Sequence, residues 1–246
     1  MSDGLLLLHA WPVDSRMWSA EVAALAATLP VVAPNHPGFG GTGSVGETMT
    51  MRAAAEHALA ELDAARIDRA VVVGCSIGGY VGFELRRREP ERVLGMGLVN
   101  TRSVADTPQA AAVRRELASR LLNEGSDFLL ADPPALLSEA AESSLRDRVR
   151  AWIAEQPASS IAAASLGMAE RPDSTPDLPG IGVPTLVLTA EGDRLIPPEV
   201  SLEMTDGLPD SESIVLPGAG HLSNLEAPQQ FLRALRRLLE RCGLPA

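Results

Sequence analysis

The chain has 246 residues, of which 46% are hydrophobic and 3% aromatic, and it carries a formal net charge of -11. This length is enough for one α/β domain with an inserted segment and for a sizeable core. The negative charge argues against nucleic-acid backbones and anionic membrane surfaces as partners, since both need clustered Lys and Arg. All 21 basic residues are Arg, which excludes mechanisms that depend on a lysine Schiff base or a phosphate-binding lysine.

The amino terminus and the two cysteines indicate a cytoplasmic protein. The apolar run near the start is too short for a signal peptide and has no basic residues before it. No apolar stretch approaches the ~20 residues that cross a bilayer. Cys75 and Cys242 form no C-x-x-C pair, and a single bridge is an unusual staple for a chain of this size, so both are expected to be free thiols.

Short apolar runs alternate with amphipathic segments through the first hundred residues. Continuous apolar runs are typical of parallel strands, because helices cover both faces of such a sheet. The segments between them place apolar residues at helical spacing. The predicted strands are residues 5–8, 31–33, 70–74 and 93–99, and the predicted helices are 19–29, 50–66 and 77–88.

The pattern changes at residues 101–175, which contain helical patterns and no strand pattern. The alternation then resumes, which predicts an α/β fold with a mostly parallel sheet of about six strands and helices on both faces. Residues 1–100 and 176–246 would form the core. Residues 101–175 would form a helical lid over the carboxyl ends of the strands, where open α/β sheets bind ligands. The later strands are 184–189 and 213–216, and the later helices are 199–205 and 228–241.

A serine lies in the turn between the strongest predicted strand and the next helix. The segment Gly74-Cys75-Ser76-Ile77-Gly78 fits G-x-S-x-G, a sharp turn that exposes a nucleophilic serine and leaves no room for side chains at the glycines. The following helix points its amino end at the serine, so the Ile77 amide is a candidate donor to an oxyanion. Ser76 is the predicted nucleophile, and Cys75 is expected to be a small buried side chain that points elsewhere.

A serine hydroxyl needs a neighbouring base, and the chain offers four histidines. His9 ends a buried strand, His36 lies in a turn and His57 lies on the face of a predicted helix, which are structural or solvent-exposed positions. His221 lies in the glycine-rich loop directly after the last strand, and such a loop is able to bring an imidazole to the strand ends. His221 is therefore the predicted base.

The acid that orients this histidine is expected between the serine and the histidine in the sequence, as in other enzymes with this serine turn. Asp193 follows strand 184–189 and is the predicted acid, because a carboxylate there is able to accept the second ring proton of His221. Glu191 is the nearest alternative, and Asp210 is a more distant one.

The remaining parts of the site are expected from a loop and from the lid. The loop at residues 9–12 follows the first strand and offers the Trp11 amide as a second oxyanion donor. In the lid, Leu145, Trp152 and Met168 are candidate substrate contacts, with the core of the lid itself as their alternative role.

Together these features resemble the α/β-hydrolase family along nearly the whole chain. Within the family, residues 168–176 and 221–226 are most similar to small bacterial lidded esterases, which include the 3-oxoadipate enol-lactonases. The resemblance implies hydrolysis of a carboxylic ester or lactone of a small molecule through an acyl-enzyme, without a cofactor. The stretches that match the family as a whole are residues 7–12, 37–43, 74–79, 192–193 and 218–221.

One departure from the family concerns the start of the sheet. Family members usually have a strand hairpin before the strand that corresponds to residues 5–8, and this chain has four residues there. The strand at 31–33 would then be an exposed edge, and we expect a homodimer or loops to cover it.

Several other functions fit the sequence less well. Gly38, Gly40 and Gly43 match the dinucleotide-binding pattern G-x-G-x-x-G, but the pattern does not open a helix here, which favours a turn-rich loop. The histidines and cysteines have no metal-ligand spacing, so neither a cofactor nor a metal is expected. The triad would also serve acyl transfer, carbon–carbon bond hydrolysis or perhydrolysis, and a non-catalytic small-molecule binding module is the remaining alternative.

Overall fold

A parallel sheet occupies the centre of the fold. In the computed structural model, which describes residues 2–43 and 45–246, the sheet has six strands in the order β2-β1-β3-β4-β5-β6, and each adjacent pair is parallel. The predicted mostly parallel sheet is confirmed, and β2 lies at one edge of it. The homodimer suggested for that edge stays a prediction. The strands are β1 (Ser2–Leu8), β2 (Val31–Val32), β3 (Ile67–Cys75), β4 (Val93–Val99), β5 (Thr185–Ala190) and β6 (Ser211–Leu216).

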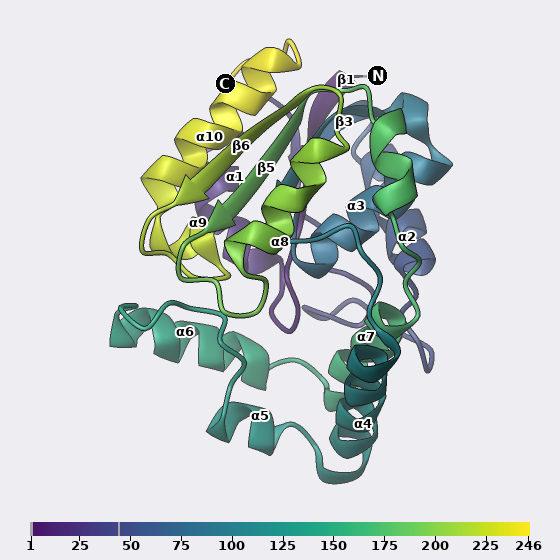
Figure 1. Cartoon of the computed structure of the whole chain (residues 1–246), viewed down its shortest axis with the longest axis vertical. Coiled ribbons are helices and arrows are strands. Elements are labelled where there is room, and N and C mark those ends of the chain that lie inside the picture. Colours follow the sequence, from purple (N-terminus) through teal and green to yellow (C-terminus); the bar gives the residue numbers. More distant parts are fainter. Residues whose placement is uncertain (1, 44) are drawn as a thin grey trace.

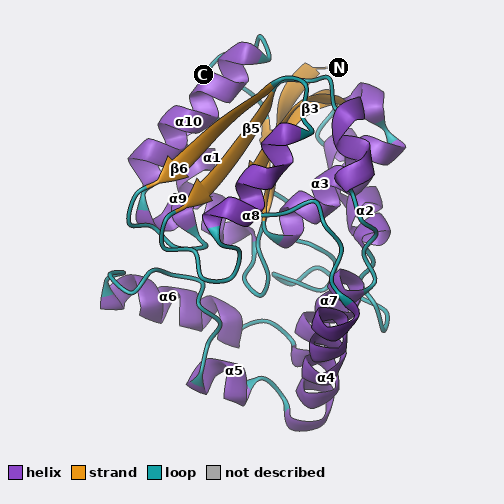
Figure 2. Cartoon of the chain, in the orientation of Figure 1, coloured by secondary structure: helices purple, strands orange, loops and turns teal. Residues whose placement is uncertain are grey.

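Helices cover both faces of the sheet (Figures 1 and 2). Side chains alternate along β1, so Leu6 and Leu8 join one cluster of buried residues, and Leu5 and Leu7 join the other. Helices α2 and α3 complete the first cluster, and α1 and α10 complete the second. Since both faces are covered, β1 reads as a continuous apolar run. The core helices are α1 (Ser19–Leu25), α2 (Met51–Ala64), α3 (Ile77–Arg88), α8 (Pro198–Leu202), α9 (Ser223–Glu226) and α10 (Pro228–Arg241).

Several elements differ in extent from their sequence prediction. β1 begins at Ser2 and not at residue 5, and α1 ends at Leu25 and not at residue 29. β3 begins at Ile67 because its polar residues continue the parallel pairing with β1, in which Asp3 lies opposite Arg69 and forms an ion pair of 2.8 Å with it. The helix predicted at 199–205 is instead α8 followed by a 3₁₀ turn at Glu203–Asp206. None of these differences moves a residue of the predicted site.

The helices between β4 and β5 lie beyond the carboxyl ends of the strands (Figure 1). The first of them begins at Thr107, whose side chain accepts a hydrogen bond from Ala110 N, with Pro at the first helical position. Within residues 2–43 and 45–246, no helix is long and apolar enough to cross a membrane. The helices of this region are α4 (Pro108–Glu124), α5 (Asp127–Ala131), α6 (Ser143–Ala154) and α7 (Ala158–Ala169).

Helix α7 approaches the core so closely that one of its residues has no room for a side chain. A Cβ added to Gly167 would lie 1.8 Å from the backbone oxygen of Met49, and Met49 N already donates to the Ala163 oxygen at 3.0 Å. Gly167→Ala must shift one of these two segments, so we expect it to lower the free energy of unfolding by about 3 kcal/mol.

Urea denaturation of Gly167→Ala and of a matched glycine variant measures this loss. Gly180 is exposed, and a Cβ added there meets no heavy atom within 4 Å, so Gly180→Ala is the control. Equal stability of the two variants would show that α7 does not need a glycine at this contact.

Candidate active site

The serine turn joins β3 to α3 with a strained backbone. Ser76 has φ 56° and ψ -116°, which is costly for a residue with a side chain. A Cβ added to Gly74 would lie 2.1 Å from the Gly78 oxygen, and one added to Gly78 would lie 2.2 Å from the Leu8 oxygen. Thr101 Oγ1 donates a hydrogen bond to the Ser76 oxygen at 2.8 Å. The crowding explains why both glycine positions of the motif have no side chain.

His221 and Asp193 meet at the carboxyl end of the sheet. His221 Nδ1 lies 2.8 Å from Asp193 Oδ2, and both side chains are almost fully buried. Asp193 Oδ1 accepts hydrogen bonds from the Leu195 and Ile196 amides at 2.9 and 3.0 Å. Burial raises the pKa of Asp193, but the hydrogen bond and charge of His221, the Ile196 amide and Asn100 outweigh it and hold this pKa below its usual range. A carboxylate here accepts a hydrogen bond from Nδ1–H of His221, which leaves Nε2 as the basic nitrogen.

Asn100 and Ser223 support this pair and were not found by sequence reasoning. Asn100 Nδ2 donates to Asp193 Oδ2 at 2.9 Å, and Ser223 Oγ donates to Asn100 Oδ1 at 2.7 Å. These bonds tie the end of β4 to both the acid and the histidine loop. One sequence signal could have identified Asn100, because it is an Asn directly after a strand. Asn tolerates the positive φ of 44° observed there.

The two alternative acids lie elsewhere. Glu191 is exposed, and its Oε2 accepts a hydrogen bond from Gly218 N at 3.1 Å. Asp210 pairs with Arg241 at 2.5 Å. The structure therefore brings Asp193, and neither alternative, to His221.

His9 and His36 form a buried pair beside the site. His36 N donates to His9 Nε2 at 2.8 Å, and His36 Nε2 donates to the His9 oxygen at 3.0 Å. Burial lowers the pKa of His9 to about 4 and also lowers the pKa of His36, so both rings are neutral at pH 7. The third alternative, His57, lies on α2 with its Nε2 4.0 Å from Glu61. His9 and His36 are buried structural residues, as their sequence positions indicate, whereas His57 is half-buried with its Nε2 away from solvent.

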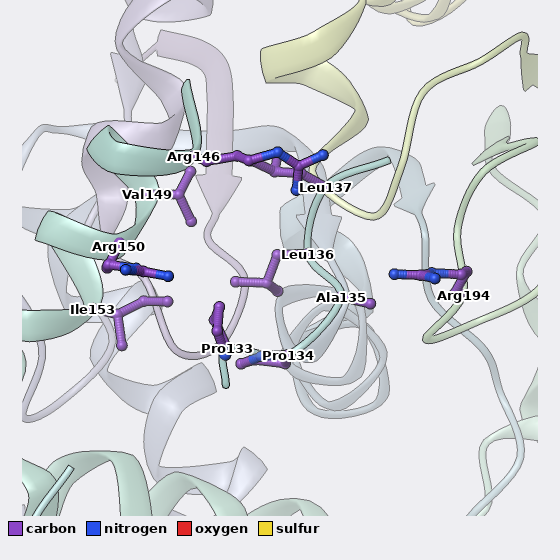
Figure 3. A pocket seen from close by; sticks show the side chains of 10 residues that line it. All are labelled: Pro133, Pro134, Ala135, Leu136, Leu137, Arg146, Val149, Arg150, Ile153 and Arg194. Atoms are coloured by element: carbon purple, nitrogen blue, oxygen red, sulfur yellow. The ribbon is translucent and has the colours of Figure 1, made fainter. Parts of the chain in front are cut away.

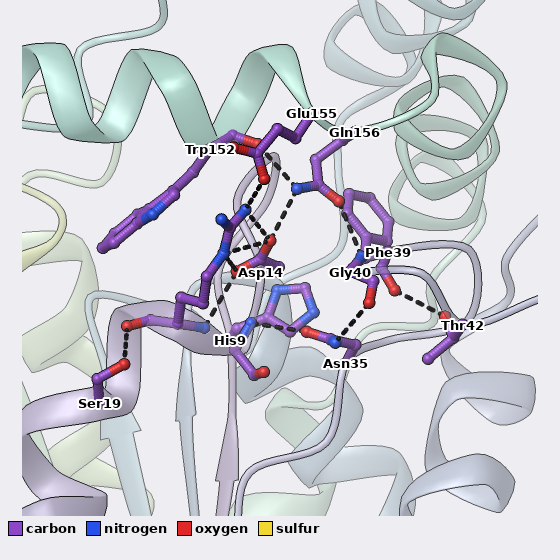
Figure 4. A network of polar contacts seen from close by, with 12 residues as sticks. His9, Asp14, Ser19, Asn35, Phe39, Gly40, Thr42, Trp152, Glu155 and Gln156 are labelled. Atoms are coloured by element: carbon purple, nitrogen blue, oxygen red, sulfur yellow. Dashed lines mark hydrogen bonds and ion pairs between the residues drawn. The ribbon is translucent and has the colours of Figure 1, made fainter.

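A polar network ties the loop that follows β1 to the lid (Figure 4). Gln156, just after α6, donates to Asp14 Oδ2 at 2.8 Å and accepts from Gly40 N at 2.9 Å. Asp14 also pairs with Arg16, and Asn35 Oδ1 accepts from Ser15 N at 2.8 Å. The network fixes the backbone on either side of the loop that carries Trp11.

The two backbone amides predicted to bind the oxyanion have no acceptor among the described residues. Among the hydrogen bonds of residues 2–43 and 45–246, neither the Trp11 amide nor the Ile77 amide is a donor. Ile77 begins α3, where the helix leaves its first amides unpaired. The Trp11 side chain is held separately, since its Nε1 donates to the Ile161 oxygen at 3.1 Å.

Ser76 and His221 line the same small cavity, of about 120 Å³. Met168 of α7 forms part of its wall, and its role as a substrate contact stays a prediction. The wall is mainly apolar, with two arginines among its residues. The other lining residues are Trp11, Tyr80, Arg102, Arg114, Pro134, Leu195 and Ile196.

Leu145 and Trp152, the other two candidate substrate contacts, are not among the described residues that line this cavity, and their packing fits the alternative role in the core of the lid. Both lie on α6, whose apolar face packs into the second core cluster, so Leu145 is buried lid core. Trp152 lies against that cluster, with the guanidiniums of Arg16 and Arg148 each 5.8 Å from its ring centre. Helix α6 borders a different cavity of about 190 Å³, which shares Pro134 with the one at Ser76 (Figure 3).

Among the described residues we find no second catalytic or metal-binding site, either at Cys75 or at a group of acidic and histidine side chains. The Cys75 thiol is buried and contacts the His221 oxygen at 3.6 Å, and burial raises its pKa well above the usual value. Within the part of the chain that the structure describes, no group of three His, Cys, Asp or Glu side chains is placed to hold a metal ion. Ser76, His221 and Asp193 therefore remain the candidate catalytic residues of the site.

Comparison with known proteins identifies the family of the chain. The sequence model of the alpha/beta hydrolase family matches residues 5–234. The chain belongs to the alpha/beta hydrolase family. A pimeloyl-[acyl-carrier protein] methyl ester esterase of Aeromonas hydrophila is 30% identical over 96% of this chain and 94% of its own length. The resemblance predicted from the sequence is confirmed.

Solved structures show the same relationship. A thermophilic esterase from Thermogutta terrifontis, with malate bound, is 37% identical and has a TM-score of 0.90, covering 98% of this chain and 92% of that one. The enol-lactonase from Burkholderia xenovorans LB400 has a TM-score of 0.89 over 98% of this chain and 92% of its own, and at 24% identity it shows the fold alone. The enzyme class expected from the sequence, a carboxylic ester hydrolase, agrees with the names of these relatives.

Proposed function

We propose that the chain hydrolyses a carboxylic ester or lactone of a small molecule through an acyl-enzyme on Ser76. One observation carries the proposal: Ser76 and His221 line one cavity, and His221 is hydrogen-bonded from behind to the buried carboxylate of Asp193. Relatives named as esterases support the ester as the bond that is cleaved.

In the first half of the reaction, Ser76 Oγ attacks the ester carbonyl while His221 Nε2 takes its proton. Asp193 stabilises the imidazolium and keeps its orientation. The amides of Ile77 and Trp11 would bind the oxyanion, each contributing about 2.7–4 kcal/mol to the transition state. His221 then gives the proton to the leaving alcohol, and the acyl group stays on Ser76.

In the second half, water takes the place of the alcohol. His221 removes a proton from the water as its oxygen attacks the acyl carbon. His221 then returns the proton to Ser76 Oγ while the acyl–oxygen bond to Ser76 breaks and the carboxylic acid leaves. A cavity of about 120 Å³ has room for a short acyl group. Malate, bound in the Thermogutta esterase, is also a small carboxylic acid. Acyl transfer, carbon–carbon cleavage and perhydrolysis use the same residues but find no support in the names of these relatives.

Labelling with a fluorophosphonate tests the nucleophile. We expect one label per chain, mapped by peptide mass to Ser76 and not to Cys75, together with hydrolysis of p-nitrophenyl acetate by the unlabelled protein. Labelling should abolish this hydrolysis. A protein that neither reacts with the probe nor hydrolyses the ester would favour a non-catalytic binding module instead.

A further inference from the structure

Three arginines surround one buried carboxylate in the region between β4 and the end of α7. Asp106 is fully buried as a side chain and lies 2.8 Å from Arg102, 2.5 Å from Arg114 and 2.8 Å from Arg171. The four residues come from the segment after β4, from α4 and from the segment after α7. Sequence reasoning had not identified these four residues individually.

This cluster has an excess of positive charge. Burial raises the pKa of Asp106, but the charges of Arg114 and Arg171 outweigh this effect and hold the pKa below its usual range, so Asp106 is ionised. Three guanidiniums then face one carboxylate. Arg171 alone is enough to neutralise Asp106, because it is itself buried and pairs with it directly.

The arginines divide into one structural residue and two that face the cavity. Arg171 also donates to the Met168 and Val104 oxygens through its two terminal nitrogens and lies over the Tyr80 ring at 4.1 Å, so these two nitrogens are already engaged. Arg102 and Arg114, by contrast, line the cavity that contains Ser76 and His221. Their side chains are 25% and 23% exposed, which keeps them within reach of a bound molecule.

The wall of this cavity offers no acid to balance them. None of the described residues that line it is Asp or Glu. Arg102 and Arg114 each bond to Asp106 through one nitrogen, and the buried Nε of Arg102 has no hydrogen-bond partner among residues 2–43 and 45–246. Guanidinium groups in this state match a carboxylate in both charge and shape.

We propose that Arg102 and Arg114 form a carboxylate-binding subsite, so that the substrate is a small ester or lactone that carries a carboxylate of its own. The inference rests on the proposed function, since the ester must lie at Ser76 while its acid group lies at the arginines. A monoester of a short dicarboxylic acid fits this description. The chain as a whole has a net charge of -11, so a local positive site is what attracts such an anion.

Two esters of matched shape test the proposal. Monoethyl succinate presents a carboxylate where ethyl 4-methylpentanoate presents an isopropyl group, and ethanol release measures kcat/KM for both. We expect the wild type to favour the acid ester by about 10- to 100-fold, the range for a hydrogen bond to a charged group. Comparable rates on the two esters, or a preference for the neutral one, would overturn the subsite.

Variants assign the preference to the arginines. Arg114→Met should lose most of the preference through a rise in KM for the acid ester, whereas Arg115→Met, an exposed neighbour on α4 with the same change of charge, should keep it. Asp106 keeps Arg102 and Arg171 as partners in the first variant, and Arg102→Met gives an independent second one. Equal effects of Arg114→Met and Arg115→Met would contradict the assignment.

Inhibition by a product supplies a readout that does not depend on turnover of the acid ester. Succinate should inhibit hydrolysis of p-nitrophenyl acetate competitively, and its inhibition constant should rise about tenfold in Arg114→Met. If the wild type hydrolyses the neutral ester and succinate does not compete, the subsite is wrong and the proposed function stands. If neither ester is hydrolysed and Ser76 is not labelled, both are wrong.

Discussion

Ser76→Ala is expected to lower kcat for p-nitrophenyl acetate by about 10,000- to 1,000,000-fold while the protein stays folded. The described residues that line the cavity include no thiol and no second serine or threonine to take its place. Alanine meets the same φ of 56° as serine, so the strain of the turn is unchanged and the melting temperature should stay close to that of the wild type.

The adjacent cysteine provides the control for this variant. Cys75 lies in the same turn, but its thiol is buried against the histidine loop and its raised pKa keeps it protonated. Cys75→Ala should therefore retain turnover within a few fold. Substantial activity in Ser76→Ala, lost on removal of Cys75, would transfer the role of nucleophile to the thiol.

The strands of the sheet were predictable because the burial of a strand determines its pattern of apolar residues. β1 is covered on both faces, so a buried strand had to read as Leu5 to Leu8 without interruption. The glycines of the serine turn were equally informative, because backbone atoms occupy the space of their missing side chains. In both cases a structural constraint on a few residues determined which residue types the sequence has there.

The helices between β4 and β5 were less predictable. A helical pattern shows which face of a helix is buried, but not which part of the protein packs against that face. Leu145 and Trp152 share an apolar face of α6, and that face packs on the core instead of on the cavity. The cluster around Asp106 is harder still, since Arg102, Arg114 and Arg171 meet only after the lid has folded. Neither hydrophobic periodicity nor a sequence motif predicts such a contact.

Asp193→Asn is expected to lower kcat by about 10,000-fold with little change in the fold. Asp193 Oδ1 accepts two backbone amides, from Leu195 and Ile196, so the amide oxygen of an asparagine would keep that place. Its NH₂ group would then replace Oδ2 and face His221 Nδ1, to which it donates, and the hydrogen bond from Asn100 Nδ2 would be lost. The imidazole must give up the proton at Nδ1 and carry one at Nε2, where it no longer accepts the proton of Ser76.

Glu191→Gln is the matched control, because it makes the same change of charge two residues away, at a carboxylate that bonds only to Gly218 N among the described contacts. We expect this variant to retain kcat within a few fold, measured with p-nitrophenyl acetate across pH 6–9. If the wrong tautomer is the cause of the loss in Asp193→Asn, activity should recover in part at high pH, where hydroxide replaces the base. A large loss in Glu191→Gln and a small one in Asp193→Asn would instead assign the orienting acid to Glu191 and require the loop between them to rearrange during catalysis.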